Sequence, residues 1–213
     1  MDDSEISDSE CPACKIALIG ESGVGKSSII LRFSKNEFNE DTLATTGGSF
    51  TTETIELKKD QRLKILLWDT MGEEKYRSLA KIFYQKSSAV ILVYDVTNIK
   101  SFKNLKDFWY KEVKQNTSSD IIFAVAGNKN DLDLPLKDKV VDPKEVKEFA
   151  DSIKAPFFEI SAKDSIGIDS LFKTIGEKYL SSNPDPKDPK PGPVTRPSVL
   201  TKDNFTKKTK KCC

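Results

Sequence analysis

Apolar runs alternate with amphipathic segments through the middle of the chain, and this alternation constrains the fold more than any other feature of the sequence. Continuous runs such as residues 89–94 are typical of parallel strands that are covered on both faces. The predicted strands cover residues 14–19, 49–57, 63–68, 89–94, 121–126 and 156–160. Because helical patterns separate most of them, we predict an α/β fold with helices on both faces of a doubly wound, six-stranded sheet.

Three segments between these strands carry apolar side chains at helical spacing. The stripes are Phe102, Leu105, Phe108, Trp109 and Val113; Val146, Phe149, Ala150 and Ile153; and Ile168, Leu171, Phe172, Ile175 and Tyr179. The second stripe follows Asp142 and Pro143, which are an N-cap residue and a proline at the first helical position. Residues 49–68 are the exception, because residues 58–62 join two strand patterns without a helix. We therefore expect one antiparallel edge strand in a mostly parallel sheet.

The two ends of the chain differ from its middle in charge and composition. The formal net charge is +1, but residues 1–10 hold five acidic side chains and residues 181–213 hold eight basic and three acidic ones. Six of the ten prolines lie between Pro184 and Pro197, and such a segment cannot bury a core. We expect a disordered acidic extension over residues 1–13, one domain over 14–180 and a disordered Pro/Lys-rich tail over 181–213.

Neither a membrane span nor a metal or redox centre is indicated. The longest apolar run has six residues, whereas a spanning helix needs about 20, and the acidic N-terminus lacks the pattern of a secretory signal. Since the chain has no histidine, a four-cysteine zinc site would require Cys11 and Cys14 to meet Cys212 and Cys213. Cys-Pro-Ala-Cys precedes the first strand, while a thioredoxin-like motif follows one, so we expect reduced thiols.

A glycine-rich segment follows the first predicted strand. Residues 20–27, Gly-Glu-Ser-Gly-Val-Gly-Lys-Ser, match G-x-x-x-x-G-K-[ST], in which backbone N–H groups surround phosphate oxygens. Lys26 reaches the β- and γ-phosphates in such a loop, Ser27 ligates Mg²⁺, and the following helix adds its positive end. A chance match arises in about 1 in 100 chains of this length. The pattern predicts a P-loop NTPase fold with phosphate-binding residues Ser22, Gly23, Val24, Gly25, Lys26, Ser27 and Ser28.

Two polar segments follow later strands, at the edge where ligands bind in open α/β sheets. Asp131 in Asn128-Lys129-Asn130-Asp131 can accept hydrogen bonds from guanine N1–H and the 2-amino group, a donor pair that adenine lacks. The Lys129 stem can cover the base, and Asn128 can tie this segment to the phosphate loop. A second segment, Ser161-Ala162-Lys163, can offer a backbone N–H to guanine O6. A polar turn after one strand is common, so the guanine assignment depends on both segments.

The remaining candidates concern the metal and the γ-phosphate. Asp69 ends an apolar strand and can hold Mg²⁺ through water, and the Gly72 N–H can reach the γ-phosphate. Thr45 can ligate Mg²⁺ only while the γ-phosphate is present, although neighbouring threonines leave its register open and a solubilising loop residue is the alternative. We therefore expect GTP or GDP as ligand, with Mg²⁺ held by Ser27, Thr45 and Asp69.

With these motifs in order, residues 14–180 resemble a small GTPase of the Ras superfamily. The Rab branch is indicated by Trp68-Asp69-Thr70, by Tyr76-Arg77-Ser78-Leu79 and by Cys212-Cys213. The resemblance implies that Phe38 packs edge-on against the guanine and that Cys212 and Cys213 carry geranylgeranyl groups. It also implies an effector surface made of Phe50, Trp68 and Phe83, for which ordinary core packing is the alternative.

The same resemblance implies a GTP-binding switch of vesicle and membrane trafficking that hydrolyses GTP slowly and depends on an activating protein. Its expected partners are an exchange factor, a GTPase-activating protein, a GDP-dissociation inhibitor, the prenylation escort machinery and effectors of the GTP form. The expected location is the cytoplasmic face of an endosomal or other vesicle membrane, with a cytosolic pool. A monomer is expected. No nucleic-acid partner is expected, because the lysine-rich tail is short and lacks interleaved aromatic residues.

Three positions depart from the family pattern. Thr46 replaces an isoleucine, Met71 replaces an alanine, and Glu73 replaces the glutamine that orients the attacking water. The expected catalytic residues are Glu73, Lys26 and Gly72, with Glu73 putting the hydrolysis rate in doubt. A binding-only pseudo-GTPase adaptor is therefore the alternative. A P-loop kinase is disfavoured, because the four arginines are scattered and no arginine-rich lid is visible.

Overall fold

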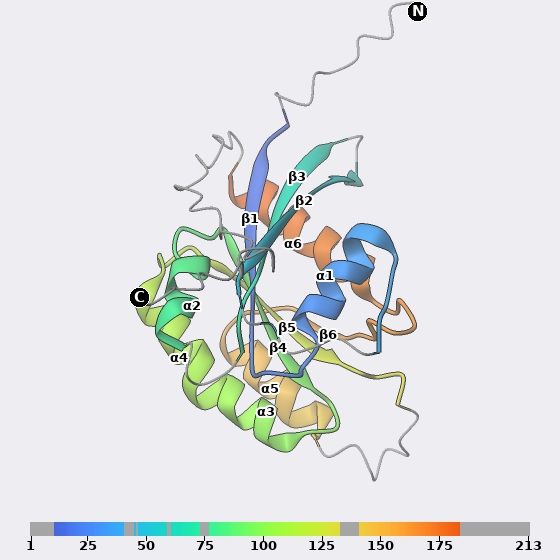
Figure 1. The fold of residues 1–213 in the computed structure, drawn as a ribbon. Coiled ribbons are helices and arrows are strands. Elements are labelled where there is room, and N and C mark those ends of the chain that lie inside the picture. The colour runs from blue at the N-terminus through green and yellow to red at the C-terminus, as the bar shows by residue number, and fades with distance from the viewer. Residues whose placement is uncertain are drawn as a thin grey trace, which may run out of the picture.

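The protein, described here from a computed structural model, is built on a six-stranded sheet with the strand order β2-β3-β1-β4-β5-β6 (Figure 1). The structure describes residues 11–40, 45, 47–58, 61–72, 77–132 and 141–183. The strands are β1 (Ala13–Ile19), β2 (Ser49–Glu56), β3 (Arg62–Asp69), β4 (Ala89–Asp95), β5 (Ile122–Asn128) and β6 (Phe157–Glu159). All six predicted strands are present, and β2 is antiparallel to β3 at the sheet edge while the other pairings are parallel. The predicted sheet is therefore confirmed.

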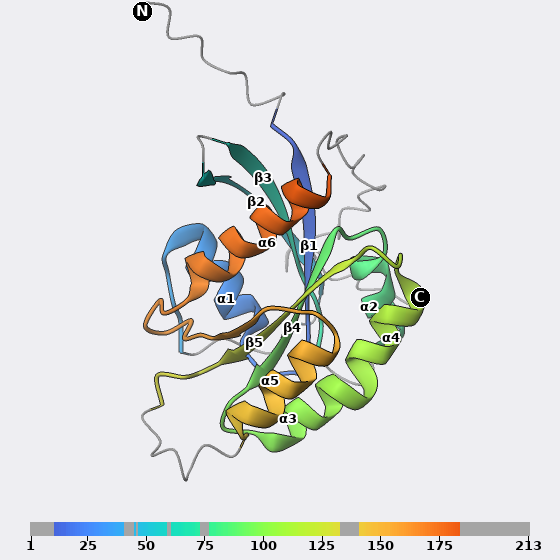
Figure 2. The same ribbon diagram turned by 180° about the vertical axis from the view of Figure 1, so that it is seen from behind.

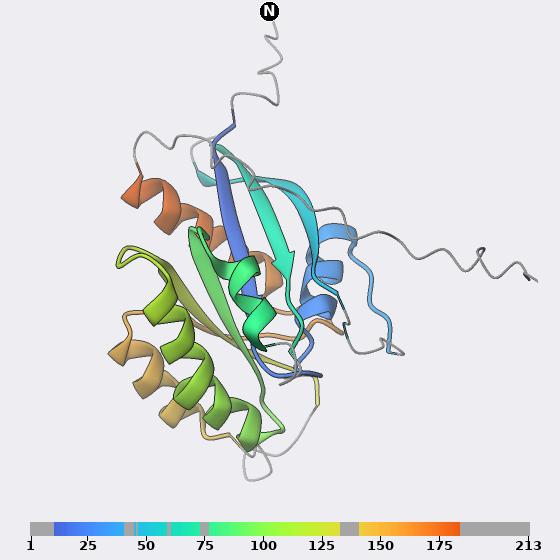
Figure 3. The same cartoon turned by 60° about the vertical axis from the view of Figure 1, so that its left-hand side comes forward.

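Helices cover both faces of this sheet. They are α1 (Lys26–Lys35), α2 (Arg77–Tyr84), α3 (Ile99–Asn104), α4 (Tyr110–Asn116), α5 (Pro143–Ser152) and α6 (Ile168–Ser182), with a π-helical turn at Leu105–Trp109 between α3 and α4. Figures 2 and 3 show α1 and α6 on one face and the other helices on the opposite face. Each face has its own apolar core, with Ile29, Phe172 and Ile175 on the first and Phe102, Trp109 and Val146 on the second. The three predicted apolar stripes thus supply the buried helix faces.

Local sequence signals account for several helix ends. The Asp142 carboxylate accepts a hydrogen bond from the Lys144 N–H at 2.9 Å, and Pro143 occupies the first turn of α5, as predicted. Asn98 caps α3 in the same way, through the Lys100 N–H at 3.0 Å. The π-helical turn has no counterpart in the sequence pattern, which reads as one continuous stripe.

The folded part begins earlier than residue 14. Ala13 pairs with Lys64 in the β1–β3 ladder, and the Pro12 carbonyl accepts a hydrogen bond from the Lys64 N–H at 2.9 Å. Cys11 and Cys14 are free and buried, and burial raises the pKa of Cys14 to about 12. A protonated, buried thiol is a poor nucleophile, so Cys14 is poorly suited to thiol exchange. Of the helices that the structure describes, none is both long and apolar enough to cross a bilayer.

The parallel strands place their carboxyl ends along one edge of the sheet, and this edge positions the site. Asp95 at the end of β4 lies opposite Asn128 at the end of β5 in the ladder. The loops that follow β1, β3, β5 and β6 therefore converge, as open α/β sheets require of a ligand site.

Candidate functional site

A pocket of about 400 Å³ lies at this edge, within the usual size range of small-molecule sites. Most of the predicted site residues line it: Ser22, Gly23, Gly25, Lys26, Ser27, Ser28, Phe38, Thr45, Gly72, Asn128, Lys129, Asp131, Ala162 and Lys163. Val24, Asp69 and Ser161 are buried and are not among the lining residues. Glu73, Cys212 and Cys213 lie outside the described residues. Segments far apart in the sequence are thus brought to one cavity.

Glycines form the wall on the phosphate side because neighbouring groups approach too closely for a side chain. Gly25 has φ 93°, and a Cβ there would collide with the Asn128 amide nitrogen. A Cβ on Gly72 would collide with the backbone of Glu21 and Ser22. The loop after β3 therefore packs directly on the glycine-rich loop.

Lys26 is the buried cation of this wall. Its side chain is 5% exposed, and Nζ donates to the carbonyls of Gly20 and Glu21 at 2.9 and 2.8 Å. Burial lowers the pKa of Lys26 to about 8, against the opposing effects of Asp69 and Glu21. Such a group is stabilised in its charged form by an anion at the pocket.

Three side-chain oxygens gather next to this lysine. The Ser27 hydroxyl donates to Asp69 Oδ2 at 2.5 Å and lies 2.7 Å from Thr45 Oγ1. Asp69 Oδ1 is buried and has no hydrogen-bond partner among the described residues. Burial raises the pKa of Asp69, while the Ser27 hydrogen bond and Lys26 lower it. A buried carboxylate oxygen of this kind is costly unless a cation or donor binds it.

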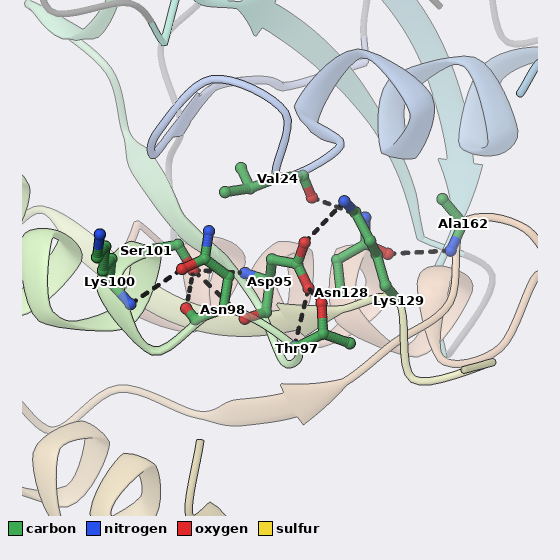
Figure 4. Close-up of polar contacts among 9 residues, drawn as sticks. All are labelled: Val24, Asp95, Thr97, Asn98, Lys100, Ser101, Asn128, Lys129 and Ala162. Atoms are coloured by element: carbon green, nitrogen blue, oxygen red, sulfur yellow. Dashed lines mark hydrogen bonds and ion pairs between the residues drawn. The ribbon is translucent and has the colours of Figure 1, made fainter. Parts of the chain in front are cut away.

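Asn128 joins the two ends of the pocket. Its Nδ2 donates to the Val24 carbonyl at 2.9 Å, and its Oδ1 accepts from the Ala162 N–H at 3.1 Å (Figure 4). The predicted tie between this segment and the phosphate loop is confirmed. The same side chain also fixes the loop after β6, which the sequence did not indicate.

Asp131 is positioned by a buried serine. The Ser161 hydroxyl donates to Asp131 Oδ1 at 2.6 Å and accepts from the Asp164 N–H at 3.0 Å. Ser161 was predicted as part of the base-binding segment, but it is fully buried and contacts the pocket residue Asp131 instead of lining the cavity. Its function in the fold is therefore to hold the carboxylate that faces the pocket.

The sequence reasoning missed Asp95. Its carboxylate lies 2.7 Å from Lys129 Nζ and accepts from the Thr97 N–H and hydroxyl at 2.9 and 2.7 Å (Figure 4). Lys129 has a positive φ of 71°, an uncommon conformation for a residue other than glycine. The signal was present, because Asp95 stands at the carboxyl end of a predicted strand. Asn39, Glu40 and Leu132 also line the pocket and were not predicted.

An aromatic row lies on the β2–β3 side of the molecule. The rings of Phe50 and Trp68 are stacked with centroids 5.5 Å apart, and Phe83 lies 6.0 Å from Trp68. Phe50 is 50% exposed, so this residue at least is not ordinary core packing. The register of the hairpin brings Phe50 and Trp68 together.

The doubly wound sheet, the glycine-rich loop before α1 and the converging polar loops define the class of P-loop GTPases. The family model described as "Ras family" matches residues 15–181. Ras-related protein Rab-22A is similar to this chain, with 41% identity over 172 residues in Canis lupus familiaris, covering 81% of this chain and 86% of that protein. Human Rab-22A has 41% identity over 169 residues, covering 79% and 84%. Ras-related protein Rab-31 of Rattus norvegicus has 41% identity over 174 residues, covering 80% and 85%.

The chain therefore belongs to the Ras family and to its Rab branch. It is a GTP-binding switch of membrane trafficking and a small GTPase that hydrolyses GTP to GDP. Like other Rab-type switches it works with regulators and effectors. The predicted fold, family and activity are thus confirmed, and nothing favours the pseudo-GTPase alternative.

Proposed function

We propose that this switch holds GTP or GDP together with Mg²⁺ in the pocket described above, at the cytoplasmic face of an intracellular membrane. The observation that supports the metal most strongly is Asp69 Oδ1, which is buried beside two hydroxyl oxygens and has no hydrogen-bond partner in the described part of the chain. Hydroxyl and carboxylate oxygens suit Mg²⁺, which keeps several waters and binds few protein ligands. Ser27, Thr45 and Asp69 are the residues that would hold it. When bound, Mg²⁺ neutralises charge on the β- and γ-phosphate oxygens.

Different residues of the chain bind the phosphates and the base of the nucleotide. Lys26 and the backbone N–H groups of residues 22–28 bind the phosphates, helped by the positive end of α1. Gly72 lies against this loop and offers its N–H to the γ-phosphate. At the other end Asp131 binds the guanine edge, and Phe38 and the Lys129 stem cover the base.

Hydrolysis transfers the γ-phosphoryl group to water, and Glu73 is the proposed residue beside that water. A glutamine amide accepts from water and donates to a phosphate oxygen, whereas an ionised carboxylate only accepts and adds negative charge. We therefore expect slow intrinsic hydrolysis, with an arginine supplied by the activating protein, a contribution of about 10³–10⁵ in rate.

Glu73→Gln should raise the single-turnover rate of GTP hydrolysis in the presence of the activating protein. Glu74→Gln removes the adjacent negative charge and is the matched control, expected to leave the rate in the presence of the activating protein unchanged. A wild type that is faster than Glu73→Gln would instead identify Glu73 as a working proton acceptor.

The ends of the chain supply the proposed membrane attachment. We propose that the chain ends in two lipidated cysteines, Cys212 and Cys213. Two prenyl groups anchor stably where one binds only marginally. The tail lysines Lys207, Lys208, Lys210 and Lys211 would each add about 1 kcal/mol at an anionic leaflet.

Replacing Cys212 and Cys213 by serine should move the protein from the membrane fraction to the cytosol. Replacing the four tail lysines by glutamine should release only part of it, because the lipids remain. Fractionation of cells that express each variant measures both effects. Wild-type membrane recovery of the double serine variant would contradict lipid attachment.

The proposed partners follow from this cycle. An exchange factor loads GTP, a GTPase-activating protein supplies the arginine, and a GDP-dissociation inhibitor and the prenylation escort handle the lipidated form. The aromatic row of Phe50, Trp68 and Phe83 is the proposed effector surface. We propose a monomer. We also propose that it binds no nucleic acid, since a net charge of +1 gives little attraction to a polyanion.

A further inference from the structure

The mouth of the pocket is bounded by two segments that are far apart in the sequence. One is the segment after α1, where Phe38, Asn39 and Glu40 line the cavity, and the other is the loop after β6, where Ala162 and Lys163 line it. Any ligand that leaves the pocket on this side passes between them. Contacts that join the two segments therefore affect the rate at which a ligand dissociates.

Arg32 joins their backbones. Its Nε donates to the Ala162 carbonyl and its Nη2 to the Lys163 carbonyl, both at 2.7 Å, while Nη1 donates to the Asn36 carbonyl at 2.7 Å. The planar guanidinium presents five donors in a fixed fork and stays charged at every physiological pH. Arg32 thus links the main chain at the end of α1, at Asn36, to the main chain of the loop after β6.

A second link joins the side chains across the mouth. Lys163 Nζ lies 2.7 Å from Glu40 Oε1, and the two side chains are 50% and 70% exposed. Hydrogen bonding to Lys163 lowers the pKa of Glu40, and the same bond raises the pKa of Lys163. Both groups are therefore charged across the neutral pH range, and water and salt reach the pair freely.

We propose that Glu40 and Lys163 form an ion-pair clasp across the mouth of the pocket and that this clasp slows the release of a guanine nucleotide. Because Arg32 fixes the backbones, the long side chains are the part that opens. An interaction that must break before the ligand leaves acts mainly on the dissociation rate. The proposal rests on the proposed placement of GDP and GTP in this pocket.

Release of tritium-labelled GDP from the Mg²⁺-loaded protein tests the clasp. Glu40→Gln and Lys163→Gln should each accelerate release about two- to fivefold at low salt, the range expected for an exposed ion pair. In a double-mutant cycle, Glu40→Gln should have no further effect once Lys163 is glutamine. Raising salt from about 0.02 M to about 0.5 M should accelerate GDP release from the wild type toward the rate of the variants, because added salt screens an ion pair as exposed as this one.

Asp151→Asn is the matched control. It removes an exposed ion pair of similar geometry, Asp151 with Lys147 at 2.6 Å on α5, and should leave GDP release unchanged at both salt concentrations. Equal release from the wild type and Glu40→Gln at low salt overturns the clasp, as does an undiminished effect of Glu40→Gln in the Lys163→Gln background. A wild type that does not retain labelled GDP overturns the nucleotide assignment itself, which separates the two failures.

Discussion

The two ends of the pocket differ in how their polar groups are satisfied. At the base end, Asn128 bonds to the Val24 carbonyl and the Ala162 N–H, and Asp131 accepts from Ser161. At the phosphate end, buried Lys26 bonds only to neutral carbonyls among the contacts described above, and Asp69 keeps a buried oxygen without a partner among the described residues. The base end is organised by the protein, and the phosphate end keeps unsatisfied charge.

This difference assigns recognition of the base to one end of the pocket and the response to the γ-phosphate to the other. Side chains fixed by internal hydrogen bonds can read the shape and donors of a base without moving, which favours specificity. Unsatisfied buried charges gain most when ligands of opposite charge bind, so the phosphate end should respond most to the presence of a γ-phosphate and a metal. Changes at the base end should therefore alter which base binds, and changes at the phosphate end should alter how many phosphates are preferred.

The largest expected effect is at the base end. Asp131→Asn replaces one carboxylate oxygen with an amide donor, so the side chain loses a charge-assisted pair of hydrogen bonds to guanine. Two such bonds correspond to a loss of about 10²–10⁴ in affinity for GDP and GTP. Binding of xanthine nucleotides should improve, because the amide can donate to the oxygen that replaces the 2-amino group.

Equilibrium titration with GDP, XDP and ATP measures this change of base. Asp164→Asn removes the same charge from the neighbouring loop and should leave all three affinities near their wild-type values. Equal binding of ATP and GTP by the wild type would show that the base end does not read guanine.

A smaller and differently directed effect is expected at the phosphate end. Ser27→Asn removes the hydroxyl that contacts both Asp69 and Thr45. Binding of GTP should weaken about tenfold more than binding of GDP, or by about 1.4 kcal/mol more, since GTP carries more charge for the metal to neutralise.

Competition between GTP and GDP with and without a chelator measures this preference. Chelation should weaken GTP binding relative to GDP binding in the wild type. In Ser27→Asn it should change the ratio of the two affinities little. An unchanged GTP affinity in the variant would show that Ser27 is not part of the metal site. The phosphate end would then respond to the metal no more than the base end does.

Most of the fold could be predicted because several of its strands, such as β4, are continuous apolar runs and three of its helical segments carry single apolar stripes. The predicted strand ends are wrong where a polar residue still pairs in the sheet. β5 continues two residues past the predicted end, to Asn128, because a polar residue at the end of a strand still pairs in the ladder with Asp95. The π-helical turn at Leu105–Trp109 leaves the apolar spacing almost unchanged, so periodicity could not reveal it.

The site was predictable where chemistry and spacing form one local motif, as in residues 20–27 and 128–131. It was not predictable where a residue acts through a distant partner. Arg32 bonds to carbonyls of Ala162 and Lys163, and backbone acceptors leave no trace in a sequence. Glu40 pairs with Lys163 across the pocket, and an isolated glutamate in a polar segment carries no signal of its partner.

Asp95 offers the smallest test of the comparison, because it belongs to the base end but acts only through Lys129. Thr97→Val is the matched control for the variant Asp95→Asn. This change removes the hydroxyl that donates to Asp95 Oδ1 at 2.7 Å, while the backbone N–H of residue 97 and the charge of Asp95 remain. Lys129 should then keep its partner, so the GDP affinity should stay near the wild-type value.

Asp95→Asn keeps an oxygen for Thr97 but turns an amide donor toward the Lys129 ammonium, which lies 2.7 Å from the present carboxylate. Two donors cannot pair, so the Lys129 side chain should lose its fixed position over the base while Asp131 and Asn128 keep theirs. Since Asp95 is buried but Lys129 is partly exposed, we expect a loss of about 1 kcal/mol, or about fivefold in GDP affinity. The preference for guanine over xanthine should be unchanged, because the group that reads the base edge is intact. A shift in base preference would mean that the base end behaves as one coupled network, in which Lys129 and its partner help to position Asp131.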